Sequence, residues 1–210
     1  MVARDNERQP ASRKRLFWRL LAFPPVRAAI AGLCRFMTWR VAWERGPPVA
    51  ASARDIVRLW RIEHFRDVSL VADEPWRLSQ EVVLRGDGPV LDVHIVGSNL
   101  LALLSARQRW RAVITEEFHS LAPQLDSRDE VALVGTTILA RQVTEFGAIL
   151  RPIPDGLHRT WDTFYRRLIL LAFHPGGADR AAHVAPPVLE AAISRVEFCR
   201  RFGRHKTDGG

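Results

Sequence analysis

Asp92 and His94 are the two residues whose types and spacing are best suited to acid–base chemistry. They stand two positions apart, so a strand over 90–96 would place both side chains on one face. A carboxylate beside an imidazole can raise the pKa of the imidazole and orient it as a general base. The alternative is a hydrogen-bonded structural pair that orders the turn leading to Asn99. Both interpretations are open at this point.

Other polar residues could hold a substrate close to this pair. Asn99 and Thr136 have short side chains that could bind a substrate, although helix capping is the more economical role for each. Farther along the chain, Trp161, Asp162 and Arg166 are expected on one helix. An aromatic face and a bidentate guanidinium group in that arrangement could line a groove for a polyol.

Several motifs with well-known chemistry are absent from the sequence. The chain contains no G-x-S-x-G, G-x-x-x-x-G-K-[ST], G-x-G-x-x-G or H-E-x-x-H segment. Its seven histidines include no pair three to five residues apart, and Cys34 and Cys199 are far from each other. We therefore expect no metal ion, no cofactor and no disulfide framework, and a reducing compartment fits best.

The formal net charge of +8 belongs to the two ends of the chain. Residues 1–45 carry +7 and residues 199–210 carry +3, whereas residues 46–198 carry −2. A folded body without a basic excess disfavours nucleic acid as a partner. With 47% hydrophobic and 26% charged residues over 210 positions, the composition is typical of one globular domain and argues against a polytopic membrane protein.

The segment from Arg13 to Arg45 combines a net charge of +7 with aromatic side chains, and no apolar run in it could span a bilayer. This combination predicts reversible docking on an anionic membrane surface. The alternative is that a helix over 26–43 packs an apolar stripe onto the domain. The stripe residues are Ile30, Leu33, Met37 and Val41. The residues expected to contact the membrane are Arg15, Phe17, Trp18, Arg19, Arg35, Trp39 and Arg40.

Turn-forming sequences divide the rest of the chain into short elements. The expected strands cover 68–71, 78–84, 90–96, 131–135 and 148–153, while 56–62 fits a helix or a strand equally well. In the strand over 90–96, Leu91, Val93 and Ile95 share the face that belongs in the core. The expected helices cover 26–43, 100–121, 157–173 and 187–202, together with a helix from Thr136 or Thr137 to Phe146. Pro123 and Gly147 are expected just beyond the ends of two of these helices.

These elements predict an α+β fold. A small β-meander and a strand–helix–strand unit with a right-handed crossover are expected to pack with several helices. A basic helix at the N-terminus and another helix at the C-terminus flank this body. The expected divisions are a disordered arm over 1–12, a basic amphipathic segment with a linker over 13–50, an α+β domain over 51–175, and a helix with a polar tail over 176–210.

A series of segments occurs here in a recognisable order. The run Gly86-Asp87-Gly88-Pro89-Val90-Leu91-Asp92-Val93-His94-Ile95-Val96-Gly97-Ser98-Asn99 is followed by a long helix, by 131–137, by Glu145-Phe146-Gly147-Ala148-Ile149 and by a tryptophan-bearing helix. Over roughly 55–175 this order resembles the YkoP-like family. The family pattern has a Gly-Asp turn, a strand ending in a Leu-His-x-x-Asn-like segment, and a Gly-x-Thr helix leading to Leu-Gly-Phe. In this chain Val93-His94 stands in place of Leu-His, and Phe146-Gly147-Ala148 departs from Leu-Gly-Phe.

The resemblance implies a bacterial domain without an assigned activity, found alone or fused to polysaccharide deacetylases and near envelope glycosyltransferase genes. The metal signature of the deacetylase, an Asp with an H-x-x-x-H pair, is absent here. We therefore expect an accessory protein of cell-envelope polysaccharide or lipid-linked sugar metabolism. The alternative is a small hydrolase or transferase that uses Asp92 and His94 as its acid–base pair.

The expected location is cytoplasmic, with peripheral attachment to the inner face of the membrane as the prediction for the N-terminal segment. The expected partners are an anionic membrane surface, a saccharide or sugar-lipid ligand, and an envelope glycosyltransferase or deacetylase.

Overall fold

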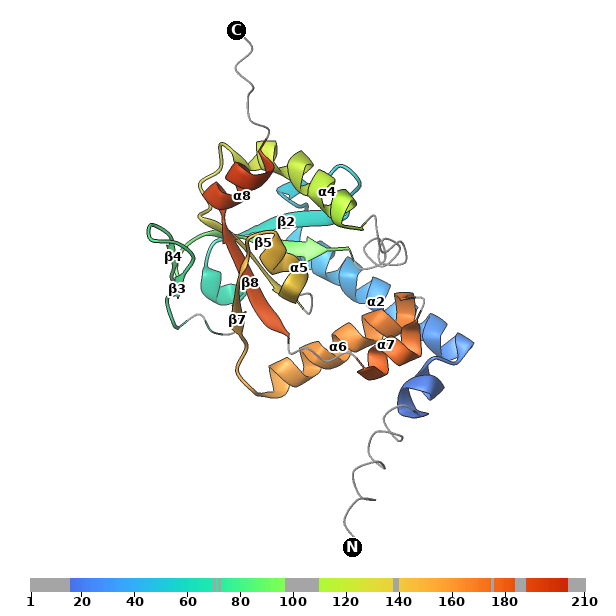
Figure 1. Cartoon of the computed structure of the whole chain (residues 1–210). Coiled ribbons are helices and arrows are strands. Elements are labelled where there is room, and N and C mark those ends of the chain that lie inside the picture. Colours follow the sequence, from blue (N-terminus) through green and yellow to red (C-terminus); the bar gives the residue numbers. More distant parts are fainter. Residues whose placement is uncertain are drawn as a thin grey trace, which may run out of the picture.

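The computed structural model describes residues 16–69, 71, 73–96, 110–137, 140–174, 176–183 and 188–203. These residues form a six-stranded mixed sheet, a separate two-stranded hairpin and several helices (Figure 1). The strand order in the sheet is β1-β2-β5-β6-β8-β7, with β5 and β6 parallel and all other neighbours antiparallel. The α+β fold expected from the sequence is confirmed.

The strands of the sheet are β1 (Ala50–Ala51), β2 (Val57–Ile62), β5 (Val90–Ile95), β6 (Ala132–Thr137), β7 (Ile149–Pro152) and β8 (Leu189–Ser194). The hairpin consists of β3 (Trp76–Arg77) and β4 (Val83–Leu84). The helices are α2 (Pro24–Arg45), α4 (Trp110–Leu125), α5 (Ala140–Glu145), α6 (Leu157–Phe173), α7 (Gly177–His183) and α8 (Arg195–Phe202), together with the 3-10 helix η1 (Phe65–Asp67).

Different elements cover the two faces of the sheet. On the first face, Leu59, Leu91 and Leu133 pack with apolar side chains of α4 and α8. On the second face, Val90 and Val134 pack with η1 and the β3–β4 hairpin. A third apolar cluster joins α2 to α6 and α7, the group of helices at the lower right of Figure 1. The described residues therefore form two sheet-based cores and one helical core.

The helix expected over 26–43 is α2, which extends two residues farther at each end. Pro24 and Pro25 occupy its first positions, where their fixed φ favours a helix and their missing N–H groups need no intrahelical partner. Gly46 follows the helix with a φ of +71°, a left-handed conformation that glycine adopts without strain. The indole Nε1 of Trp60 donates to the carbonyl of Gly46 at 2.9 Å. The C-terminal end of α2 is thereby fixed to the sheet.

The strand expected over 90–96 is confirmed as β5, and 56–62 is the strand β2. Leu91, Val93 and Ile95 pack on the first face, as their alternation predicted. Val90 is also fully buried, because η1 and the hairpin cover the start of the second face.

The helix expected over 187–202 is wrong in its first half. Residues 189–194 form β8, which pairs with β6 on one side and β7 on the other, and α8 begins only at Arg195. Their Leu, Glu and Ala residues favour a helix locally, but pairing along both edges of the strand outweighs that preference. Ser194 separates the two elements, since its Oγ accepts a hydrogen bond from the backbone N–H of Glu197 at 3.2 Å.

The expected meander between 68 and 84 is also largely wrong. The backbone N–H groups of Val68 and Ser69 bond back to the carbonyl of Phe65, so this stretch forms η1 and a turn where the strand 68–71 was expected. In the strand expected over 78–84, the Oγ of Ser79 accepts hydrogen bonds from the N–H groups of residues 81 and 82. This turn leaves only the two-residue strands β3 and β4.

Two expected helix boundaries differ from the structure. Pro123 lies inside α4, which continues to Leu125 because Leu121, Ala122 and Leu125 are buried and hold the last turn in place. Thr136 and Thr137 belong to β6 and do not cap α5. The first part of the helix expected over 100–121 lies outside the described residues.

The expected strand–helix–strand unit is present as β6, α5 and β7. Gly147 follows α5 with a φ of +91°, in agreement with its predicted role. β8 lies between β6 and β7, so these two strands are not direct neighbours in the sheet.

Candidate functional site

Polar side chains from five strands form a row across the second face of the sheet. Arg58 of β2 pairs in register with His94 of β5. Glu190 of β8 pairs with Thr136 of β6 on one side and with Arg151 of β7 on the other. In the parallel pairing of β5 with β6, Asp92 lies opposite Val134, and His94 and Thr136, each two positions farther along, project from the same face as that pair. Because residues paired across strands project from the same face, Arg58, His94, Thr136, Glu190 and Arg151 form one polar row.

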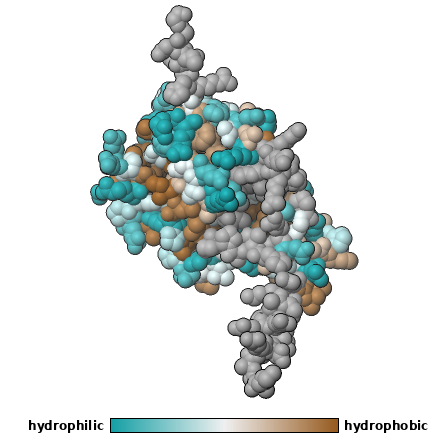
Figure 2. Space-filling model, in the orientation of Figure 1, coloured by the Kyte–Doolittle hydropathy of each residue, from teal (hydrophilic) through white to brown (hydrophobic). Residues whose placement is uncertain are grey.

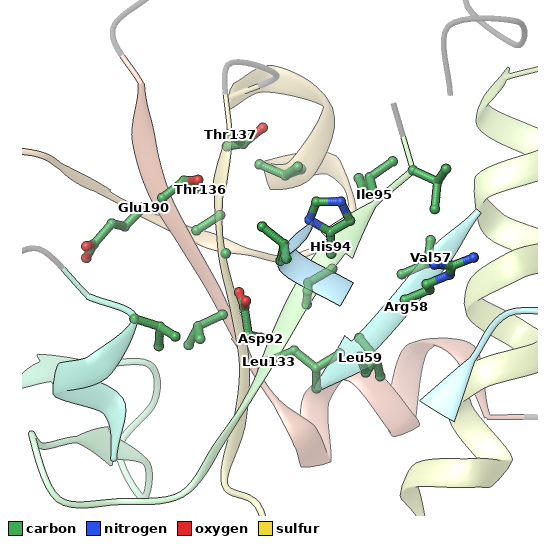
Figure 3. Close-up of a pocket in the computed structure, with 18 of the residues that line it drawn as sticks. Val57, Arg58, Leu59, Asp92, His94, Ile95, Leu133, Thr136, Thr137 and Glu190 are labelled. Carbon is green, nitrogen blue, oxygen red and sulfur yellow. The ribbon is translucent and has the colours of Figure 1, made fainter. Parts of the chain in front are cut away.

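A cavity of about 780 Å³ lies beside this row. Its lining comes from the sheet, α2 and α6, with further residues from η1, β3, α4, α5 and α8. Figure 3 shows Asp92, His94, Thr136 and Glu190 around it. The pairing of β5 with β6 covers only Leu91 and Asp92 of β5, so the carboxyl ends of the two strands separate and the cavity extends between them. The crevice beyond the carboxyl ends of parallel strands is a common place for ligands to bind.

Asp92 forms an ion pair with Arg45, the last residue of α2. The Asp92 side chain is only 15% exposed. The guanidinium carbon of Arg45 also lies 6.0 Å from the ring centroid of Trp60, on the neighbouring strand. Asp92 therefore anchors α2 to the sheet, and its charge is directed to Arg45.

His94 packs edge-on against Trp60, with 5.8 Å between the ring centroids. Burial is the main reason that the pKa of His94 is lowered to about 4, and the positive charges of Arg45, Arg166 and Arg58 contribute to the same effect. This direction is opposite to the rise expected from a neighbouring carboxylate, because burial dominates the pKa of His94 and the Asp92 carboxylate is paired with Arg45. At pH 7 the imidazole is neutral, with one nitrogen able to donate a hydrogen bond and the other able to accept one.

Arg166 connects α6 to the polar row. Its Nη2 donates a hydrogen bond to the Oγ1 of Thr136, and a carboxylate oxygen of Asp162 lies 3.7 Å from the same nitrogen. Burial lowers the pKa of Arg166, while the charge of Asp162 opposes that effect. The Nε of Arg166 is buried and has no hydrogen-bond partner in the described part of the chain. Since buried polar groups are normally paired, an acceptor oxygen of a ligand in the cavity would satisfy this N–H.

The structure brings most of the predicted site residues to one place. Those that line the cavity are Asp92, His94, Thr136, Asp162 and Arg166. Trp161 is 63% exposed on α6 and does not belong to the lining, whereas Tyr165 of the same helix does. Asn99 lies outside the described residues.

A buried cluster around Glu190 was not predicted from the sequence. The Nη2 of Arg151 lies 2.6 Å from a carboxylate oxygen of Glu190, and the Oγ of Ser69 donates to the same carboxylate at 3.1 Å. The guanidinium carbon of Arg151 lies 4.5 Å from the ring centroid of Trp76. Glu190 lies within the helix expected over 187–202. Its place in β8 follows from pairing with β6 and β7, because the residues 189–194 show no alternation of apolar and polar types.

Positive and negative groups balance each other in the lining of the cavity. The charged residues are Arg35, Arg45, Arg58, Asp67, Asp92, Asp162, Arg166 and Glu190. Apolar side chains of the sheet and of α2, α4, α5, α6 and α8 form most of the rest of the wall, among them Ile169 and Phe173 of α6. No group of three or more His, Cys, Asp or Glu among the described residues could hold a metal ion. The arrangement can bind a ligand that has both hydroxyl groups and an apolar part.

Comparison with known proteins identifies the family. Residues 72–202, more than half of the chain, match the family model described as the YkoP domain. Neither the curated proteins nor the solved structures gave a match. The match covers β5, β6 and β8 and therefore includes His94, Thr136 and Glu190 of the polar row. The chain belongs to the YkoP domain family.

Proposed function

We propose that this protein is a binding protein of bacterial cell-envelope polysaccharide or lipid-linked sugar metabolism, and that its cavity holds a saccharide or a sugar-lipid. The single observation that carries the proposal is the cavity beside the polar row, with balanced charges on one part of its wall and apolar side chains on the rest. An accessory role agrees with the absence of catalytic motifs from the sequence.

The balance of charges favours a neutral polyol over a highly charged ligand. Each hydroxyl group of a sugar both donates and accepts hydrogen bonds. Asp162 and Arg166 place an acceptor and a donor next to each other, and Thr136 adds a hydroxyl group. The buried N–H of Arg166 offers a further donor to a ring or hydroxyl oxygen.

The apolar part of the wall favours a ligand with a hydrocarbon portion. Ile169 and Phe173 of α6 and Val41 of α2 line the cavity together with aliphatic side chains of the sheet. A hydrocarbon chain in such a site gains free energy from burial, at about 25 cal/mol per Å² of apolar surface. A lipid-linked sugar combines this chain with the hydroxyl groups that the polar row can bind.

The geometry favours binding over the alternative acid–base enzyme. A general base works best with a pKa near the working pH, and the pKa of His94 is lowered to about 4. Asp92, the expected orienting group, forms an ion pair with Arg45. In the binding function His94 acts as a neutral hydrogen-bonding group.

Calorimetric titration with three probes tests this proposal. The probes are dodecyl maltoside below its critical micelle concentration, free maltose, and dodecyldimethylamine oxide, which carries the same alkyl chain without a sugar. We expect dodecyl maltoside to bind more tightly than either of the other two. Equal affinity for the two alkyl compounds, or no binding of dodecyl maltoside, would contradict a sugar-lipid site.

A pair of variants locates the binding. Arg166→Gln removes the guanidinium group that reaches Thr136 and should weaken dodecyl maltoside binding about tenfold, the effect of losing a charge-assisted hydrogen bond. Arg200→Gln is the matched control, because Arg200 is an exposed, ion-paired arginine on α8 that does not line the cavity. Equal loss in both variants would place the ligand elsewhere.

A further inference from the structure

The outer side of α2 carries a continuous line of exposed aromatic side chains. Phe36, Trp39 and Trp43 are 53%, 57% and 75% exposed. Their ring centroids lie 5.8 Å apart between Phe36 and Trp39 and 5.6 Å apart between Trp39 and Trp43. Positions three and four apart share one side of a helix, and Leu33 extends the line by one turn. We call Leu33, Phe36, Trp39 and Trp43 the aromatic ridge.

The inner side of α2 is occupied by the protein itself. Cys34, Thr38 and Ala42 line the cavity, and Ile30 and Cys34 pack in the helical core with α6. The stripe that was expected to pack inward is therefore divided, because Leu33 is exposed while Ile30 belongs to the core. In the described part of the chain nothing covers the ridge.

The helical segment 16–21 and the two residues that link it to α2 add more exposed apolar side chains. They are Leu16, Phe17, Leu20 and Phe23. Figure 2 shows brown, hydrophobic atoms at the lower right, where this segment lies in Figure 1. Trp18 does not take part, since it is 4% exposed and packs against Phe164 and Leu168 in the helical core. Trp18 was expected at a membrane, and its burial removes it from the surface that a partner could reach.

The charges in this region are mostly positive. Residues 16–45 contain five arginines and one glutamate, a net charge of +4. Arg27 and Arg45 bond to the protein, through the carbonyl of Ala172 and the carboxylate of Asp92 respectively. Arg19 and Arg40 are exposed, and Arg40 is paired with Glu44. Exposed aromatic rings interspersed with arginines are complementary to an anionic lipid surface, where tryptophan prefers the level of the headgroups.

We propose that the aromatic ridge, together with Leu16, Phe17, Leu20 and Phe23, docks this protein on an anionic lipid bilayer. None of the described helices is long and apolar enough to cross a membrane, so α2 lies along the interface. The arginines hold the surface at the anionic headgroups and the ridge enters the boundary of the acyl chains. Docking does not depend on what the cavity binds. Docking places α2, whose Cys34 and Thr38 form part of the cavity wall, next to the lipid. A sugar-lipid in the bilayer would approach the cavity from that side.

Co-sedimentation of the full-length protein with vesicles tests the proposal. The vesicles are phosphatidylcholine with one quarter phosphatidylglycerol, or phosphatidylcholine alone, at low and at moderate salt. We expect binding to the anionic vesicles that weakens with salt, and little binding to the neutral vesicles. The double variant Trp39→Ser/Trp43→Ser should bind about tenfold more weakly, since two large apolar side chains no longer enter the interface.

Matched variants separate the ridge from general effects. Val131→Ser/Val196→Ser replaces exposed apolar side chains outside α2 and should leave vesicle binding unchanged. Arg19→Glu/Arg40→Glu should weaken binding at low salt while leaving the ridge intact. Circular dichroism with thermal melting checks that each variant is folded. If Trp39→Ser/Trp43→Ser is unstable, the folded Arg19→Glu/Arg40→Glu variant still tests whether this surface binds the vesicles.

Three results would overturn the proposal. The first is no binding to anionic vesicles at low salt. The second is equal binding by a folded Trp39→Ser/Trp43→Ser variant and the wild type. The third is a dimer that forms without lipid and that the same variant converts to a monomer, while vesicle binding stays unchanged. In that case a second copy of the chain would cover the ridge. The calorimetric titrations of the cavity are made without vesicles, so each proposal can fail separately.

Discussion

Burial of the His94 imidazole, together with three guanidinium groups near it, makes the folding of this protein sensitive to acid at the residue scale. The pKa of His94 is lowered to about 4 in the folded protein, against about 6.5 in an unfolded chain. Between these values the unfolded state binds a proton that the folded state does not. The stability that His94 contributes is therefore present above pH 6.5 and is lost as the pH falls towards 4.

His94→Gln tests this pH dependence. Between pH 7 and pH 4 the wild type should lose up to about 3 kcal/mol more stability than the variant, because the variant has no imidazole to protonate. Urea denaturation at several pH values measures the difference. His64→Gln is the control, since His64 is exposed, and it should follow the wild type. Superimposable pH profiles of His94→Gln and the wild type would contradict the low pKa.

The ion pair between Arg45 and Asp92 should stabilise the fold more than a surface pair does. Arg45→Ala leaves the mostly buried carboxylate of Asp92 without its partner, so we expect a loss of about 1–3 kcal/mol in the free energy of unfolding. Arg40→Ala on the same helix removes the exposed pair with Glu44 and should cost less than about 1 kcal/mol. Denaturant titration compares the two, and similar losses would show that Asp92 does not depend on Arg45.

Sequence reasoning placed Asp92 and His94 on one face correctly, because strand alternation is a local property. The sequence does not show which distant residues lie next to these two side chains in space. Arg45 is 47 residues away from Asp92, and Arg166 is 30 residues away from Thr136. The pKa of a group depends on its burial and on which distant charges the fold brings near it. For His94, burial, with the charges of three arginines added, lowers the pKa where a rise was expected.

At the scale of elements, long segments with a clear period were predicted well. The helix over 157–173 has the predicted bounds, and β5 and α2 agree within two residues. β8 was missed because its alanine-rich sequence has helical propensity, while its state is set by pairing with two distant strands. Glu190, and with it one end of the polar row, was lost for the same reason.

The boundary between β8 and α8 did carry a usable signal. Ser194 with Glu197 three residues later is the spacing of a capping box, which marks the start of a helix. Ser194→Ala should lower the free energy of unfolding by about 1 kcal/mol, because the N–H of Glu197 loses its acceptor. Ser127→Ala in the exposed loop after α4 should have little effect. Thermal or chemical denaturation of both variants checks the cap, and equal stabilities would argue against it.

At the scale of the whole molecule, α2 connects the two proposals. One side of the helix forms part of the cavity wall and the other carries the aromatic ridge, with Trp39 at the border because it also lines the cavity. Cys34 lies on the inner side and is 2% exposed, and burial raises the pKa of its thiol. A reagent can therefore reach Cys34 only through the cavity or when α2 moves away from α6.

Thiol labelling uses this property to report on the cavity. In a Cys199→Ser background Cys34 is the only thiol, and its reaction with Ellman's reagent should be slow in the folded protein. Dodecyl maltoside at ten times its dissociation constant should slow the reaction about tenfold further, since bound ligand stabilises the closed state by mass action. An unchanged rate under saturating ligand would mean that the ligand does not occupy the space beside α2.

The most direct test of a sugar-lipid site is a crystal structure of the protein with dodecyl maltoside. The account predicts density for the sugar within hydrogen-bonding distance of Thr136, Asp162 and Arg166, with an oxygen atom facing the Nε of Arg166 and the alkyl chain along Ile169 and Phe173. Density for the sugar outside the cavity, or an alkyl chain in the polar row with the sugar in solvent, would contradict it.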